Sequence, residues 1–210
     1  MSSHCRFAIN GCDVGLWFYS QSEAELLAMA SEPDRMMLEC KGYSNSVRRS
    51  EWLATRILAR QMGVSGDIVY SQHGEPMLQN SDTRISFSHT MGAVAVAKSA
   101  TLTLGIDVEQ LKRNFAKVLG RYASEQELEW VNPKNQQQMA LVWCAKEAIY
   151  KMQGNTGKVF ATQMNLQQVS PLMQEGETIA HVEDNGQWMP VSIYYKFFND
   201  YCLVLAYRGV

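Results

Sequence analysis

Polar and apolar residues alternate strictly from Leu102 to Glu109, the pattern of a β-strand with two different faces. One face carries the apolar residues Leu102, Leu104, Ile106 and Val108, and the other carries Thr103, Gly105, Asp107 and Glu109. Two carboxylates therefore project side by side near the end of the strand, where their repulsion makes burial costly unless a cation neutralises them. Mg²⁺ accepts such oxygens and completes its shell with water and phosphates. We expect Gly105 to leave this face open to a ligand; an exposed strand end with two solvated acids is the alternative.

The segment from Ala140 to Met152 is largely apolar and predicts a helix that is mostly buried. One face of this helix carries Trp143, Glu147, Tyr150, Lys151 and Gly154. A buried Glu147 would supply a third metal ligand beside the two strand carboxylates, and Lys146 and Lys151 would meet phosphate oxygens. The alternative is an ordinary surface ion pair between Glu147 and Lys151, which contributes only about 0.3–0.5 kcal/mol.

Two parts of the chain resemble each other. The segments 52–63 and 143–154 align at a tryptophan, an alanine and a closing glycine, and both predict helices that end at that glycine. Each is followed by a predicted hairpin, at residues 85–97 and 193–207, the second with its turn at 199–200. The pattern predicts an α+β fold of two helix-plus-antiparallel-sheet halves, residues 1–100 and 101–210, related by a pseudo-twofold axis, with a site at their junction. The alternative is that two helix–hairpin units look alike by chance.

Basic residues gather in the first of these helices. Arg48, Arg49 and Arg56 could clamp a phosphorylated ligand or form a solvated basic face. Ser88 and His89 stand at the start of a predicted turn and could donate hydrogen bonds to an anion, although a histidine in a turn is more often a packed residue.

A basic stripe is predicted after the acidic strand. Arg113, Lys117 and Arg121 are spaced four residues apart, and apolar residues occupy the opposite face of the helix that this spacing predicts. The stripe suggests an acidic partner, and a solvated face is the alternative. A capping box from Ser124 to Glu127 predicts the start of another helix.

The composition excludes several classes of protein. Of 210 residues, 46% are hydrophobic and 19% are charged, which is typical of a folded chain. There are 19 basic and 21 acidic side chains, without the clustered positive charge of a nucleic-acid-binding protein. No apolar run reaches the ~18–20 residues of a membrane span, and the N-terminal residues lack the pattern of a secretory signal. The five cysteines are scattered and form no CxxC pair, which argues against a disulfide framework or a zinc site. We expect a cytoplasmic protein.

Together these motifs resemble the 4′-phosphopantetheinyl transferases of the larger, pseudodimeric type. The specific motifs are Gly105-Ile-Asp-Val-Glu109 and Trp143-Cys-Ala-Lys-Glu-Ala148, and the arginine helix and the Phe87-Ser-His-Thr90 turn support them. The resemblance runs from about residue 46 to 155. One departure is Glu75, in Gly74-Glu75-Pro76, where the family often has lysine. A glutamate would oppose a nearby phosphate, so we expect any contact of this loop to be through its backbone or to the adenine.

The resemblance implies an activity and roles for the site residues. Members move the phosphopantetheine arm of coenzyme A onto a serine of an acyl or peptidyl carrier protein and release adenosine 3′,5′-bisphosphate, in the manner of a holo-[acyl-carrier-protein] synthase. The implied ligands of Mg²⁺ are Asp107, Glu109 and Glu147. Lys151, and also Lys146, would neutralise charge on the pyrophosphate. The nucleotide end would be bound by Arg49, Arg56, Ser88 and His89. Glu147 would also be the base for the carrier serine, either directly or through a metal-bound water.

Further expectations concern partners, and two rival functions stay open. The stripe of Arg113, Lys117 and Arg121 would dock an acidic carrier protein, and the internal duplication favours a monomer. The rivals are a Mg²⁺-dependent phosphohydrolase and a non-catalytic carrier-binding homologue. The sequence does not indicate whether fatty acid, polyketide, polyunsaturated lipid or non-ribosomal peptide synthesis is served, and we assign residues 156–190 no role.

Overall fold

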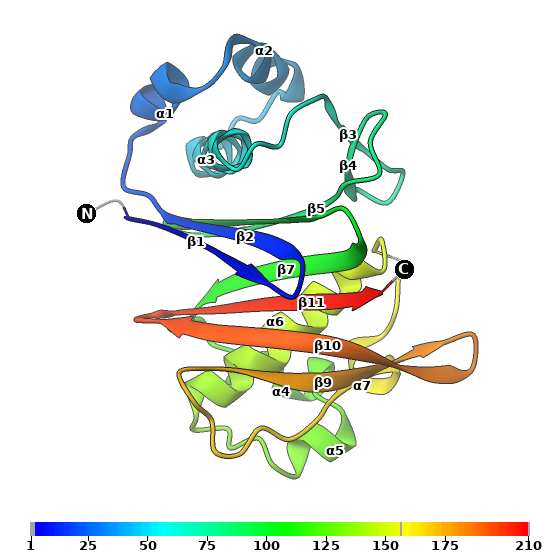
Figure 1. The fold of residues 1–210 in the computed structure, drawn as a ribbon. Coiled ribbons are helices and arrows are strands. Elements are labelled where there is room, and N and C mark those ends of the chain that lie inside the picture. Colours follow the sequence, from blue (N-terminus) through cyan, green and yellow to red (C-terminus); the bar gives the residue numbers. More distant parts are fainter. Residues whose placement is uncertain (1–2, 156, 210) are drawn as a thin grey trace.

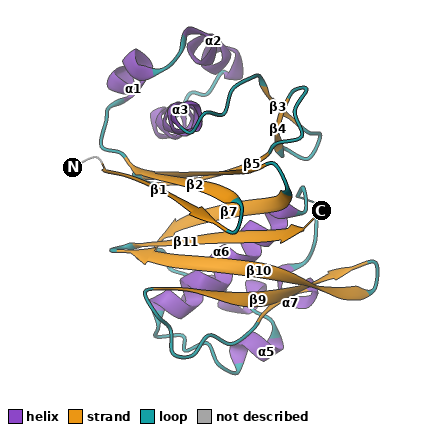
Figure 2. Ribbon diagram, in the orientation of Figure 1, coloured by secondary structure: helices purple, strands orange, loops and turns teal. Residues whose placement is uncertain are grey.

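Two antiparallel sheets lie against each other, and helices cover their outer faces (Figure 1; Figure 2). The computed structural model describes residues 3–155 and 157–209. The first sheet uses residues between Ser3 and Ser99, and the second uses residues between Leu102 and Gly209. This arrangement is the mixed helix and antiparallel-sheet fold that the sequence predicts.

The first sheet has the strand order β1-β2-β6-β5-β4-β3. Its strands are β1 (Ser3–Ile9), β2 (Cys12–Phe18), β3 (Ile68–Tyr70), β4 (Pro76–Leu78), β5 (Arg84–Thr90) and β6 (Ala93–Ser99). The helices that cover it are α1 (Glu23–Met29), α2 (Glu32–Lys41) and α3 (Ser46–Gln61). Apolar side chains of these helices and of the sheet form one core, which includes Trp17, Leu53 and Val94.

The second sheet has the strand order β7-β11-β10-β9-β8. Its strands are β7 (Leu102–Gln110), β8 (Met164–Leu166), β9 (Glu175–Asp184), β10 (Gln187–Phe198) and β11 (Tyr201–Gly209). The helices beside it are the 3₁₀ turn η1 (Ala116–Val118), α4 (Leu119–Tyr122), α5 (Glu125–Leu128), α6 (Gln136–Met152) and α7 (Phe160–Gln163). A second core lies between these helices and the sheet, and a third joins the two sheets through residues such as Leu16, Ile106 and Leu205.

The two long helices end where the sequence predicts, and both begin before the predicted segments 52–63 and 140–152. The side chains of Asn45 and Asn135 cap the first turns of α3 and α6. Gly63 and Gly154 follow the helices with φ of 72° and 70°, the left-handed conformation that glycine adopts without a steric penalty. The two predicted hairpins are also confirmed, as β5–β6 and β10–β11.

The predicted helix after the acidic strand is wrong in its first half. Residues 111–115 form a turn and an irregular segment, followed by η1 and the short α4. The side chain of Asn114 accepts a hydrogen bond from the backbone N–H of Lys117, a local cap that starts a new turn there. Arg113, Lys117 and Arg121 are all exposed, but they do not share one face of a continuous helix.

The capping box is confirmed, since Ser124 and Glu127 form hydrogen bonds with each other's backbone at the start of α5.

Within residues 3–155 and 157–209, none of the helices combines the length and the apolar character that crossing a membrane requires.

Candidate active site

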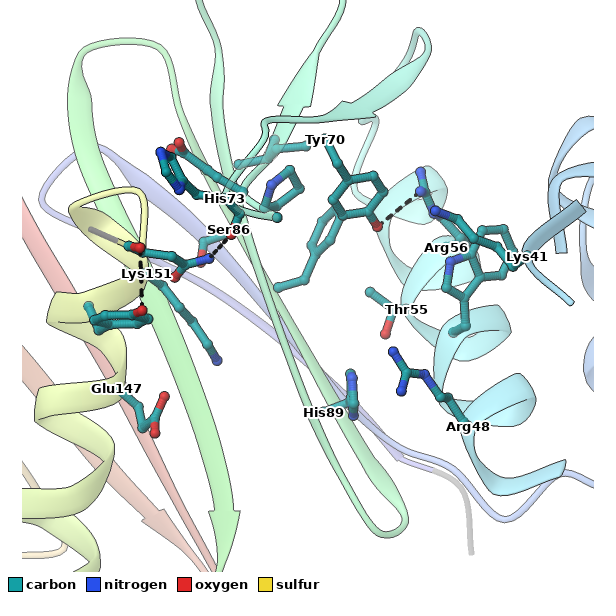
Figure 3. A pocket seen from close by; sticks show the side chains of 18 of the residues that line it. Lys41, Arg48, Thr55, Arg56, Tyr70, His73, Ser86, His89, Glu147 and Lys151 are labelled. Carbon is teal, nitrogen blue, oxygen red and sulfur yellow. Dashed lines mark hydrogen bonds between the residues drawn. The ribbon is translucent and has the colours of Figure 1, made fainter. Parts of the chain in front are cut away.

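A cavity of about 710 Å³ opens between the two halves of the chain, and both halves line it. α3 and β5 supply one wall, and the C-terminal part of α6 supplies the other (Figure 3). The ionisable residues that line the cavity include Lys41, Arg48, Arg56, His73, Glu75, His89, Glu147 and Lys151. The volume lies in the usual range for a small-molecule site.

One end of the cavity combines cations with aromatic rings. The guanidinium of Arg56 lies 4.8 Å from the centre of the Trp52 ring and donates a hydrogen bond to the Tyr70 hydroxyl at 3.2 Å. The ammonium of Lys41 lies 4.9 Å above the Tyr70 ring, and Arg48 lies 4.6 Å above Tyr43. Cations held on rings keep their N–H groups available, so this end suits an anion attached to a planar group.

Asp107 is not part of the cavity lining, but it contacts Lys151, which is, and it is held by contacts to a single oxygen. Its Oδ1 accepts hydrogen bonds from the Ser88 hydroxyl and from the Lys151 ammonium, both at 2.8 Å. Lys151 also donates to the backbone oxygen of Ile106 at 3.0 Å. The second oxygen of Asp107, Oδ2, is buried and has no hydrogen-bond partner. Lys151 therefore pairs with Asp107, and not with Glu147 as in the alternative of an ordinary surface ion pair.

Glu109 and Glu147 complete a group of three carboxylates. Oε1 of Glu109 accepts a hydrogen bond from the indole N–H of Trp143 at 3.2 Å and one from Arg113. Burial, and next the charge of Asp107, raise the pKa of Glu109. The same two causes, in the same order, raise the pKa of Glu147 to about 7. The carboxylates thus lie close enough to resist each other's ionisation.

The three carboxylates are oxygen donors of the type that a hard divalent cation binds. Across the described part of the chain, no group of three or more His, Cys, Asp or Glu side chains is placed so that it could hold a metal ion. Lys151 and Arg113 instead neutralise Asp107 and Glu109. The buried Oδ2 of Asp107, which has no hydrogen-bond partner, is a carboxylate oxygen, the kind of donor that Mg²⁺ prefers.

Residues 103–206 match the family model of the 4′-phosphopantetheinyl transferase superfamily. The matched region begins on β7, ends on β11 and contains all three carboxylates. It supports a phosphopantetheinyl transferase function in general, and with it an enzyme of the transferase class. No curated protein matches the chain.

Helix α6 packs closely against β7 at Gly105, within the region that matches the family model. This contact corrects the expectation that Gly105 leaves this face of the strand open to a ligand. A Cβ atom at residue 105 would lie 2.6 Å from the backbone nitrogen of Met152, and closer still to the backbone oxygen of Ala148. Both atoms belong to the helix backbone and cannot move aside alone. The absence of a side chain lets α6 bring Glu147 and Lys151 next to Asp107.

We therefore predict that Gly105→Ala separates α6 from β7 and disrupts the carboxylate group. Overpacking of this kind costs about 1–3 kcal/mol of folding free energy, and more where backbone atoms clash. Thermal unfolding should show a clear loss of stability together with a loss of transferase activity. The matched control is Gly120→Ala, where a Cβ meets nothing within 4 Å. Wild-type stability of Gly105→Ala would contradict this role.

Lys146 does not reach the cavity, which corrects its predicted role in binding phosphate. Its side chain is fully buried and pairs with the equally buried Glu127 at 2.6 Å. The ammonium also donates to three backbone oxygens, those of Tyr122, Phe160 and Met164. All its donors are used inside the protein, so Lys146 joins α6 to α4, α5 and α7.

Arg49 is not part of the cavity lining, which corrects its predicted role in nucleotide binding, and Arg48 lines the cavity instead. Arg49 pairs with Glu23 at 2.6 Å and with Glu39 at 3.0 Å, on α1 and α2. Arg48 shares with Trp52 and Arg56 the helix face that lines the cavity, because these residues are four positions apart. Arg56, which was predicted to bind the nucleotide, lines the cavity.

Ser88 and His89 separate, because neighbours in a strand point to opposite faces. Ser88 is buried against Asp107 and is not part of the cavity lining, which corrects its assignment to the nucleotide. His89 lines the cavity as predicted, and its Nδ1 lies 3.1 Å from Oε2 of Glu51.

Several cavity residues were not predicted from the sequence, among them Lys41, Tyr43, Trp52, Tyr70 and His73. Trp52 could have been found from its four-residue spacing to Arg56 on one helix face, but nothing local marks Lys41 or Tyr70. Glu75 lines the cavity, and its Oε2 lies beside Gly154, so the loop that carries it meets the end of α6. Asn155 also donates to the backbone oxygen of His73 at 3.0 Å in the same loop.

Proposed function

We propose that the protein transfers the 4′-phosphopantetheine group of coenzyme A to a serine of an apo acyl or peptidyl carrier protein, with Mg²⁺, and releases adenosine 3′,5′-bisphosphate. One observation carries this proposal. A single cavity extends from a cationic, aromatic wall on α3 to Glu147 and Lys151 on α6, beside the carboxylates of the region that matches the superfamily. It therefore offers a place for a phosphorylated nucleotide next to a place for its pyrophosphate.

The nucleotide end of coenzyme A would lie on the α3 wall. Lys41, Arg48 and Arg56 offer positive charge and N–H donors to phosphate oxygens, and His89 offers ring nitrogens beside them. The rings of Trp52 and Tyr70 offer apolar surface to the base. In this proposal, residues 1–100 bind the nucleotide, and residues 101–210 bind the metal and the carrier protein.

In the reaction, the serine oxygen of the carrier protein forms a bond to the phosphorus that bears the pantetheine arm. The bond from that phosphorus to the bridging oxygen of the pyrophosphate breaks, and adenosine 3′,5′-bisphosphate leaves. Glu147 lines the cavity and takes the proton of the serine hydroxyl. Lys151 places its positive charge beside the leaving phosphate.

Asp107, Glu109 and Glu147 would hold Mg²⁺. When bound, the ion neutralises negative charge on the pyrophosphate and orients its oxygens. These three side chains supply only a few oxygens, which leaves room for substrate oxygens in the preferred shell of Mg²⁺.

The finer points of the proposal concern partners and location. Three basic residues are exposed in the C-terminal half, which also carries the three carboxylates: Arg113, Lys117 and Arg121. Their positive charge would attract the acidic surface of a carrier protein. We further propose that the two halves are related by duplication and a pseudo-twofold axis, and that the protein is a cytoplasmic monomer.

The proposal is tested by incubating the protein with an apo carrier protein, coenzyme A and Mg²⁺ and measuring the intact mass of the carrier. We expect the addition of one phosphopantetheine group, at the serine, and none when the metal is chelated. Hydrolysis of coenzyme A without transfer would favour a phosphohydrolase. An unmodified carrier that nevertheless binds the protein would favour a non-catalytic homologue.

A further inference from the structure

Two buried serines of β5 attach the first sheet to the edge of the acidic strand. Within its own sheet, β7 has a neighbour only in β11, so its other edge needs different partners. The backbone N–H of Ile106 donates to the Ser86 hydroxyl at 3.1 Å, and that of Val108 donates to the Ser88 hydroxyl at 3.2 Å. The two serines are two residues apart on one face of β5, which matches the two-residue spacing of their partners on β7.

Only one of the two serines also contacts a carboxylate. The Ser88 hydroxyl accepts from Val108 and has a single proton, which it donates to Oδ1 of Asp107 at 2.8 Å. Lys151 donates to that same oxygen. Both contacts therefore hold Oδ1, and Oδ2 is left buried and without a partner.

We infer that Ser88 is a positioning residue: it fixes the carboxylate of Asp107 so that Oδ2 is the oxygen presented to the metal ion. This inference rests on the proposed function. Ser88 lies outside the cavity lining and acts only through Asp107. The N-terminal half therefore contributes to the metal centre itself as well as to nucleotide binding, although the superfamily match begins only at residue 103.

The physical reason is the loss of rotational freedom in Asp107. A carboxylate held by one hydrogen bond can rotate and exchange its two oxygens, whereas two donors on Oδ1 from opposite halves of the chain define the plane of the group. Partners that hydrogen-bond to a ligating side chain typically change metal affinity by about 10–100-fold when they are removed.

The test compares Ser88→Ala with Ser86→Ala, its matched control. Both variants lose a hydroxyl that accepts from a β7 N–H, but only the first loses a contact to Asp107. Mn²⁺ is titrated into the protein alone and followed by electron paramagnetic resonance, and thermal unfolding is measured in parallel. We expect Ser88→Ala to weaken Mn²⁺ binding about 10-fold or more. Ser86→Ala should keep the wild-type Kd, and the two variants should lose similar thermal stability.

Ser88→Thr keeps the hydroxyl and should restore the wild-type Kd, which separates the loss of the hydrogen bond from a general defect in the strand. Unchanged Mn²⁺ affinity in Ser88→Ala would overturn the inference and leave the proposed function intact. An equal weakening in Ser86→Ala would also overturn it, because the effect would then belong to the contact between β5 and β7. A wild-type protein that binds no Mn²⁺ would overturn the proposed function together with the inference.

Discussion

Replacement of Glu147 by glutamine is expected to lower the rate of phosphopantetheine transfer by about 10²–10⁴-fold, the usual contribution of a positioned general base. Glutamine has nearly the same shape, so α6 should keep its packing, but it can neither accept the serine proton nor bring a negative charge to Mg²⁺. The rate is measured as modified carrier protein per unit time. The matched control is Glu129→Gln, at an exposed position. Full activity of Glu147→Gln would contradict the proposed role.

We also expect Glu147→Gln to change how the stability of the protein depends on pH. Burial and Asp107 raise the pKa of Glu147 from 4.5 to about 7 in the folded protein. The folded protein therefore keeps this proton between pH 4.5 and about 7, where the unfolded chain has lost it, and its stability falls as the pH rises through about 7. Glutamine does not titrate. In a buffer with a chelator, wild type should lose free energy of unfolding relative to the variant across this interval.

Replacement of Lys146 by methionine is expected to destabilise the protein by about 3–5 kcal/mol, because it leaves the buried Glu127 without its cation. Methionine fills a similar volume, so the loss reports the charge rather than a cavity. For a chain of this size each kcal/mol lowers the unfolding temperature by about 2–4 °C. Chemical denaturation of the purified variant measures the free energy directly.

Two further variants make this second prediction specific. Glu127→Gln, added to Lys146→Met, should recover part of the lost stability because it removes the uncompensated charge. Lys134→Met, at an exposed position, should leave the free energy of unfolding near the wild-type value. A stable Lys146→Met protein with weakened binding of coenzyme A would contradict the structural role and favour the phosphate role that the sequence suggested.

Periodicity was sufficient to place the two elements that carry the site. The strand predicted from Leu102 to Glu109 is β7, and the helix predicted from Ala140 to Met152 lies within α6. Both predictions are confirmed because each element buries apolar residues at its own characteristic spacing. The first half of the helix predicted around Arg113 was wrong, because the side chain of Asn114 caps a new turn at Lys117 and side-chain spacing does not reveal such a local cap.

Which side chains face the cavity depended on packing that the local pattern does not contain. Arg48 and Arg49 are neighbours of the same chemistry, yet one faces the cavity and the other pairs with α1 and α2. A step of one residue turns a helix by about 100°, so the direction of each side chain depends on what packs beside it. The same reasoning applies to Ser88 and His89 on a strand, where one step reverses the face.

The sequence alone determined the order of the elements, the α+β class and the residues that bring charge, since these follow from spacing and residue type. The tertiary structure decided that Lys151 holds Asp107 while Lys146 is buried with Glu127, and that Gly105 admits a helix rather than a ligand. It also decided that Ser88 reaches a carboxylate in the other half of the chain. These outcomes depend on contacts between residues far apart in the chain, and the charge and hydrogen-bonding capacity of one residue do not specify which distant partner will use them.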